Sequence, residues 1–170
     1  MKESRQQINE INQMLRSNCS GTYTMKILDI ENRLLAAKYH GFENQILGEP
    51  FFSSCYGYKM RLSINLDEKK HGFTGHMGAY LHLMRSDHDE TLSWPFNKRY
   101  SFSVIDQQDG LDRNDYVATM VPEGENAFER PQNDESVGFG DSQLISHSEL
   151  RSRNYYIRDD VVYIKVQIEQ

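Results

Sequence analysis

The sequence predicts an all-β domain, built as an antiparallel β-sandwich and preceded by a short helix. Its 170 residues suit a single domain with room for a core. The 10 tyrosines and 8 phenylalanines are residue types that sheets favour. Beyond residue 20, many segments alternate apolar and polar residues with a period of two, which is typical of strands with one face in water.

The first 17 residues contain neither Gly nor Pro and predict a helix. Met1, Ile8 and Leu15 recur every seven residues, and Ile11 falls between them, as in the apolar seam of a coiled coil. Two heptads are too short to be stable alone. The spacing leaves two interpretations open: a helix that packs on its own domain, or the end of a longer coiled coil.

Residues 18–21 break this helix, and strands follow. The clearest alternation covers residues 58–66, where apolar side chains occupy every second position from Tyr58 to Leu66. The predicted strands cover residues 22–27, 58–66, 77–85, 99–104, 115–121 and 161–168. Short helices are expected at 31–39 and 146–153. Long helices do not separate most strands, which argues against βαβ units and favours a sandwich or barrel.

Composition and motifs exclude several function classes. A net charge of -6 argues against a dedicated nucleic-acid binder. No segment has the length and apolarity of a membrane helix. Cys19 and Cys55 lack a CxxC spacing and fit a reducing compartment, although one disulfide between them stays open.

We expect no metal, no cofactor and no catalytic residue. Four histidines gather in one region, but their spacings of five, six and six do not match the short ligand pairs of zinc sites. They are His71, His76, His82 and His88. No serine lies in the GxSxG context of a hydrolase nucleophile, so Ser146-His147 and Asp159-Asp160 do not predict a catalytic triad.

The stretch Gly138-Phe139-Gly140-Asp141 is the most distinctive short motif. A phosphate-binding loop would lead into a helix, whereas a strand is expected here, and Asp141 would repel a phosphate. The motif instead predicts an irregular edge strand. Phe139 is then either a platform for a ligand or a side chain that packs into the core.

Several longer motifs together resemble the C-terminal domain of the TNF receptor-associated factors, the TRAF domain. They are "SSCYGYKMRLSINL", "LSWPFNKRYSFSVIDQ", "FERPQND", "GFG" and "YIRDDVVYIKVQIE", in this order. The resemblance covers residues 20–170 and is closest to the fourth TRAF type. It implies an eight-stranded antiparallel sandwich (20–170) that follows the end of a coiled coil (1–17). It also implies a homotrimer joined through Met1, Ile8, Ile11 and Leu15.

The resemblance further implies a cytoplasmic adaptor that receptors recruit to the membrane. Such domains bind short extended peptides from receptor tails, which add as a strand beside the segment "SVGFGD". Two glycines would admit the peptide backbone, and Phe139 would line the groove. Carried over position by position, the peptide site comprises Ser63, Asn65, Lys69, Tyr80, Met120, Gly138, Phe139, Gly140 and Asp141.

This sequence departs from the family pattern at the positions that grip an acidic peptide side chain. Ser63 and Asn65 stand where many members have Arg and Tyr, and Glu125-Asn126-Ala127 stands where many have three serines. Lys69 and Arg61 could partly replace the missing charge. We therefore expect weak binding with a distinct preference, and poor binding of acidic motifs.

An alternative function is attachment to a membrane surface, because the fourth TRAF type is associated with phosphoinositides. This function requires the fold to gather basic residues into one patch on an otherwise acidic protein. The candidates are Lys59, Arg61, Lys69, Lys70, Lys98 and Arg99.

Overall fold

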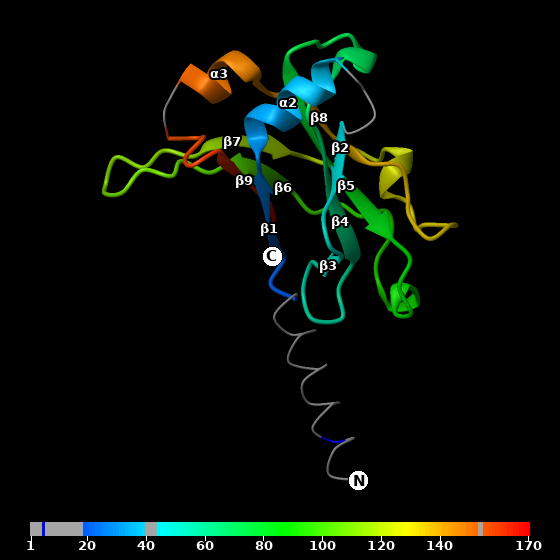
Figure 1. The fold of residues 1–170 in the computed structure, drawn as a ribbon. Coiled ribbons are helices and arrows are strands. Elements are labelled where there is room, and N and C mark those ends of the chain that lie inside the picture. Colours follow the sequence, from blue (N-terminus) through cyan, green and yellow to red (C-terminus); the bar gives the residue numbers. More distant parts are fainter. Residues whose placement is uncertain (1–4, 6–18, 40–43, 153–154) are drawn as a thin grey trace.

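A computed structural model describes residue 5 and residues 19–39, 44–152 and 155–170 (Figure 1). The predicted coiled-coil positions Met1, Ile8, Ile11 and Leu15 lie outside the described residues. The seam, and with it the boundary between a helix at 1–17 and a domain at 20–170, stays a prediction.

Two antiparallel sheets form the domain, which confirms the predicted sandwich (Figure 1). The four-stranded sheet has the order β1-β9-β6-β7, and in the five-stranded sheet β2-β4-β5-β8 are consecutive and β3 also pairs with β4. The strands are β1 (Thr22–Leu28), β2 (Gln45–Leu47), β3 (Phe51–Phe52), β4 (Lys59–Asn65), β5 (His76–Met84), β6 (Tyr100–Val104), β7 (Tyr116–Met120), β8 (Phe139–Ser146) and β9 (Val161–Ile168).

Nine strands lie within the described residues, one more than the expected eight, because one edge of the larger sheet is interrupted. β2 and β3 pair with β4 one after the other, with Leu47 opposite Ser63 and Phe51 opposite Met60. Between them Gly48 still donates its N–H to the Leu62 carbonyl at 2.8 Å. A side chain at Gly48 would approach the ring of Tyr23 to 2.7 Å, so the glycine at this interruption leaves room for the Tyr23 ring.

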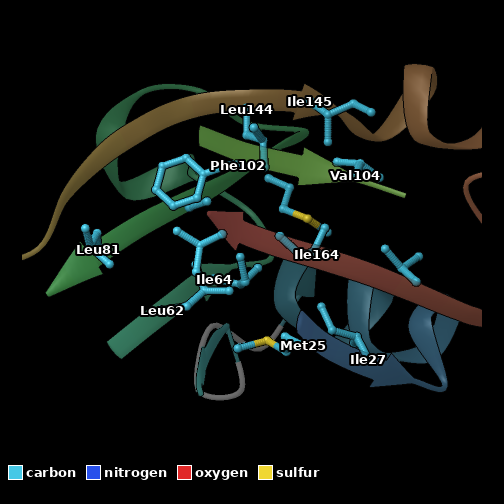
Figure 2. Close-up of a cluster of buried hydrophobic side chains, with 14 of the residues drawn as sticks. Met25, Ile27, Leu62, Ile64, Leu81, Phe102, Val104, Leu144, Ile145 and Ile164 are labelled. Atoms are coloured by element: carbon cyan, nitrogen blue, oxygen red, sulfur yellow. The ribbon is translucent and has the colours of Figure 1, made fainter. Parts of the chain in front are cut away.

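The core lies between the two sheets and contains the residues that the alternation assigned to it. Met60, Leu62 and Ile64 of β4 are fully buried, as are Phe102 and Ile164 from the facing sheet. Figure 2 shows that side chains from both sheets, including Leu144 and Ile145 of β8, meet in one cluster. The buried face predicted for residues 58–66 is therefore correct, because a shift of the strand by one residue would expose these apolar side chains.

Two short helices lie together at the end of the sandwich opposite β3 (Figure 1). α2 (Ile30–Tyr39) buries Ile30, Leu34 and Ala37, which share one helix face. α3 (His147–Ser152) is linked to α2 by an ion pair between Arg151 Nη2 and Glu31 Oε2 at 3.0 Å. Three single-turn 3-10 helices complete the fold: η1 (Lys69–His71), η2 (Asp89–Thr91) and η3 (Asn126–Phe128).

Candidate functional site

β8 forms one edge of the five-stranded sheet. Within the described chain only β5 pairs with it, with Phe139, Gly140 and Asp141 opposite Leu81, Tyr80 and Ala79. The other side of an edge strand presents backbone N–H and C=O groups that can pair with an added strand. The edge motif predicted from the sequence is therefore present.

The two glycines of the motif allow β8 to lie close against β5. A Cβ atom at Gly140 would collide with the Ala79 carbonyl oxygen and lie 2.8 Å from the Tyr80 Cα. A Cβ atom at Gly138 would lie 2.6 Å from the His82 ring. These glycines were expected to admit a peptide backbone. The structure gives them another role, which is to admit the neighbouring strand of their own sheet.

Phe139 belongs to the aromatic cluster under this edge. It is partly buried against the core, and its ring centroid lies 5.1 Å from that of Phe128. Its carbonyl accepts a hydrogen bond of 2.9 Å from the Tyr100 hydroxyl. Of the two interpretations that the sequence left open, packing against the core is the one that the structure supports. Replacing Phe139 would disturb this cluster as well as any groove.

The smaller sheet approaches the same edge through β7. Met120 is the last residue of β7 and pairs with Tyr100, whose hydroxyl reaches the Phe139 carbonyl. Burial raises the pKa of Tyr100, and the charge of Glu125 raises it further, so Glu125 lies near this hydroxyl. Tyr100 therefore links the end of β7, at Met120, to the β8 edge at Phe139.

On the outer face of the larger sheet, a polar network occupies the place expected for recognition by Ser63. The Ser63 side chain is fully buried, and its Oγ lies 2.7 Å from His82 Nε2. His82 Nδ1 lies 3.3 Å from Glu135 Oε1 and 3.2 Å from the Ser136 carbonyl oxygen. Arg61 forms a two-pronged ion pair with the same Glu135.

This network joins a serine, a histidine and a carboxylate in line, as hydrolases do, but the serine is not accessible. A nucleophile must reach a substrate, and Ser63 is 0% exposed. In this network Glu135 instead neutralises the charge of Arg61, and His82 forms a hydrogen bond with the Ser63 hydroxyl. Sequence reasoning missed Glu135 altogether and considered His82 only as a metal ligand.

A second buried network surrounds Tyr80. The Tyr80 hydroxyl donates a hydrogen bond of 2.8 Å to Glu68 Oε1, and His71 Nδ1 contacts the other oxygen of this carboxylate. Glu68 is 1% exposed and lies over Gly78, where a side chain would collide with it. Burial raises the pKa of Tyr80, as do the hydrogen bond that Tyr80 donates to Glu68 and the charges of Glu68 and Asp141. Negative charge therefore predominates around Tyr80.

Two other predicted site residues lie farther from the motif. Asn65 is partly exposed on β4, opposite Gly78 on one side and Gln45 on the other. Lys69 Nζ donates to the Ala37 and Lys38 carbonyls at 2.9 and 2.8 Å, at the C-terminal end of α2. A cation is favourable at that end of a helix. The Lys69 ammonium is therefore engaged at the end of α2, and its part in a peptide site stays a prediction.

The basic residues that were candidates for a membrane-binding patch either pair with other groups of the chain or lie on different elements. Lys69 is engaged at α2, Arg61 is paired with Glu135, and Arg99 Nε lies 3.7 Å from Glu169 Oε2. Lys59 lies on β4, Lys70 in η1 and Lys98 before β6 in the other sheet. The described chain thus gives no specific support for a gathered basic patch.

The described residues contain neither a membrane-spanning helix nor a metal-binding cluster. No helix among them is long and apolar enough to cross a membrane. No three His, Cys, Asp or Glu side chains among them come together to hold a metal ion.

Comparison with known proteins identifies the sequences and folds that the chain resembles. The family described as "TRAF/meprin, MATH domain" matches residues 43–165. TNF receptor-associated factor 2 of Homo sapiens is 29% identical over 158 residues, 92% of this chain and 31% of that protein. TNF receptor-associated factor 5 of Mus musculus is 29% identical over 152 residues, 88% of this chain and 27% of that protein.

The fold is shared with a solved structure, TRAF5 of Notothenia coriiceps. The two superpose with a TM-score of 0.82 over 99% of this chain and 84% of the other, at 24% sequence identity. The chain spans about a third of the length of the curated relatives, 31% in the human factor 2 and 27% in the mouse factor 5. The finer resemblance to the fourth TRAF type stays a prediction.

The Tyr80 network predicts a loss of stability at alkaline pH. Because the pKa of Tyr80 is raised on folding, the unfolded chain releases this proton at a lower pH than the folded domain. The stabilisation is complete below about pH 10, the ordinary tyrosine pKa, and is lost as the pH rises further. Urea denaturation should show a falling free energy of unfolding above that pH, with a shallower fall in Tyr80→Phe.

Tyr56→Phe is the matched control, since the Tyr56 side chain is 81% exposed and the change likewise removes one tyrosine hydroxyl. It should leave the alkaline slope unchanged. Equal slopes in the wild type and Tyr80→Phe would contradict the assignment.

Proposed function

Because the chain belongs to the TRAF/meprin MATH domain family, we propose that it is an adaptor domain without catalytic activity. It binds short extended peptides, which add as a strand to the free edge of β8. The observation that carries this proposal is the outer side of β8 at Phe139–Asp141, with which no strand of the described chain pairs. Tyr80 lies opposite Gly140 on β5, and Met120 pairs with Tyr100, whose hydroxyl reaches the Phe139 carbonyl. Main-chain hydrogen bonds supply affinity in this mode, and alternate side chains supply specificity.

The peptides come from cytoplasmic tails of receptors of the TNF-receptor type or of other signalling receptors. Support for this source is the similarity to TNF receptor-associated factors 1, 2, 5 and 6. On this proposal the protein is cytoplasmic and is recruited to the membrane by the receptors that it binds.

The local charges disfavour an acidic peptide side chain. Ser63 is buried against His82, the charge of Arg61 is neutralised by Glu135, and Glu68 and Asp141 flank Tyr80. A missing charge-assisted hydrogen bond costs about 1.5–3 kcal/mol. An acidic motif that depends on such a contact should therefore bind about tenfold or more weakly than it binds a site with the charged pair. Neutral polar or basic side chains suit this position better.

The domain also acts as a trimer, joined through the coiled-coil seam at Met1, Ile8, Ile11 and Leu15. The seven-residue spacing and the family resemblance support this part of the proposal. Three shallow sites on one assembly suit clustered receptor tails, because multivalency converts weak single contacts into strong overall attachment.

Strand addition predicts a periodic response to N-methylation of the peptide backbone. A peptide found by screening immobilised receptor tails should lose binding when alternate N–H groups are methylated, because only every second residue hydrogen-bonds to β8. The intervening positions should tolerate the change. Fluorescence polarisation of each methylated peptide measures the effect, and the protein itself remains unaltered.

Two outcomes of the same screen would refute the proposal. One is a bound peptide whose affinity does not change at any N-methylated position. The other is an absence of peptide binding together with sedimentation on anionic liposomes, which would favour the membrane-surface alternative.

The charge of Asp141 predicts how the preference can be shifted. Asp141→Lys should improve binding of peptides with an acidic residue near Tyr80 about fivefold relative to their amide counterparts, since an exposed charge pair contributes up to about 1 kcal/mol. Asp112→Lys makes the same change in net charge in a loop away from β8 and is the control. Titration of matched acidic and amide peptides measures the ratio. An equal gain in both variants would indicate a nonspecific effect of net charge.

Trimer formation should depend on protein concentration, because the seam within residues 1–17 is short. Light scattering should show a mass that rises toward that of a trimer at high concentration. Replacing the seam residues Ile8 and Ile11 by Asp should abolish the rise. A strictly monomeric mass for the wild type at high concentration would contradict the proposed seam.

A further inference from the structure

Backbone hydrogen bonds hold the segment that contains Cys19 in place beside the start of β1. Two residues later, Gly21 donates its N–H to the Phe52 carbonyl at 3.1 Å and accepts from the Ile168 N–H at 2.7 Å. Gly21 has a positive φ of 74°, and a side chain there would lie 2.6 Å from the Ser53 carbonyl oxygen. The segment that carries Cys19 is therefore pinned beside the end of β3.

Cys55 lies in the tight turn between β3 and β4. Ser53 and Tyr58 bracket this turn: the Ser53 N–H donates to the Tyr58 carbonyl, and the Tyr58 N–H donates to Ser53 Oγ, both at 2.9 Å. Within the turn, the Gly57 N–H donates to the Ser54 carbonyl at 2.9 Å. The turn thus presents Cys55 from a fixed backbone, and its side chain is exposed.

Cys19 and Cys55 lie at the same end of the sandwich. The hydrogen bond from Gly21 to Phe52 places the Cys19 segment beside the chain that leads into the turn of Cys55. A hydrogen bond with the Cys55 side chain helps to raise the pKa of the Cys19 thiol, so the two side chains are neighbours. They are the only two cysteines of the 170 residues. A disulfide requires two cysteines whose backbones bring the sulfurs together without distortion.

We propose that Cys19 and Cys55 are a modification site, at which a peroxide oxidises the two thiols to an intramolecular disulfide. The inference is independent of peptide binding, because the site lies at the end of the sandwich where β3 meets the start of β1. The disulfide would tie the segment that follows residues 1–18 to the β3–β4 turn.

The two thiols have different roles in this reaction. Burial raises the pKa of Cys19, as do the hydrogen bond to Cys55 and the charge of Cys55 as a thiolate. The thiolate is the nucleophile, so the exposed Cys55 reacts first. Its sulfur attacks one peroxide oxygen, the O–O bond breaks, and a sulfenic acid and one water form.

Cys19 then resolves the sulfenic acid. The Cys19 sulfur attacks the Cys55 sulfur, the S–O bond breaks, and a second water leaves. In total, the two thiols lose two hydrogens and two electrons, and hydrogen peroxide is reduced to two waters. No other reductant or oxidant is needed.

The test is exposure of the 170-residue protein to hydrogen peroxide, followed by intact mass spectrometry and peptide mapping without reductant. The wild type should lose the mass of two hydrogen atoms, yield one cross-linked peptide pair containing Cys19 and Cys55, and recover its mass with a thiol reductant. Cys19→Ser should instead accumulate oxygen on Cys55. Cys55→Ser should leave Cys19 largely unmodified under the same exposure.

A register control separates proximity from general reactivity. The double variant Cys19→Ser with Ser20→Cys keeps two thiols but moves one of them by a single residue. It should form the intramolecular disulfide at least about tenfold more slowly, because attack requires the two sulfurs to be in contact. Equal rates in the wild type and this variant would overturn the proposal. So would a wild type in which both thiols stay free or only intermolecular disulfides form.

Discussion

The absence of side chains at Gly138 and Gly140 is the constraint on which the candidate site depends. Any side chain at Gly140 would meet the backbone of β5, and any at Gly138 would meet the His82 ring. With both spaces empty, β8 pairs closely with β5, and it is the last strand of its sheet in the described chain. Phe139 packs against the aromatic cluster of the core, and the far side of β8 is a sheet edge. The two glycines therefore set how closely this edge strand approaches β5, and the proposed peptide site lies on its far side.

Carboxylates that are paired within the chain set the chemistry beside that edge. Glu135 and Glu68 both lie against the outer face of the larger sheet, where one pairs with Arg61 and the other accepts a hydrogen bond from Tyr80. Each of these two partners is therefore engaged within its own chain. On this account, specificity in this domain follows from which side chains are already paired within the chain.

The sequence predicted those parts of the molecule that follow from local pattern. Alternation placed Met60, Leu62 and Ile64 in the core, because period-two burial is read directly from residue order. It missed β2 and β3, where Gly48 and Pro50 interrupt a short edge. Lys69 and Glu135 could not be assigned from pattern, because their partners, the end of α2 and Arg61, are distant in the chain. The glycine motif predicted the edge strand, family resemblance suggested a peptide site there, and only the three-dimensional contacts revealed that the glycines admit β5.

Hydrogen exchange of the β8 amides, followed by NMR with and without a bound peptide, tests the central claim most directly. An edge strand that accepts a peptide strand exchanges some of its amides slowly only while the peptide is bound. The account predicts new protection confined mainly to residues 139–143, alternating along the strand, with the core strands β4 and β9 unchanged. Protection that appears elsewhere, with no change in the β8 amides at saturating peptide, would show that the edge of β8 is not the binding site.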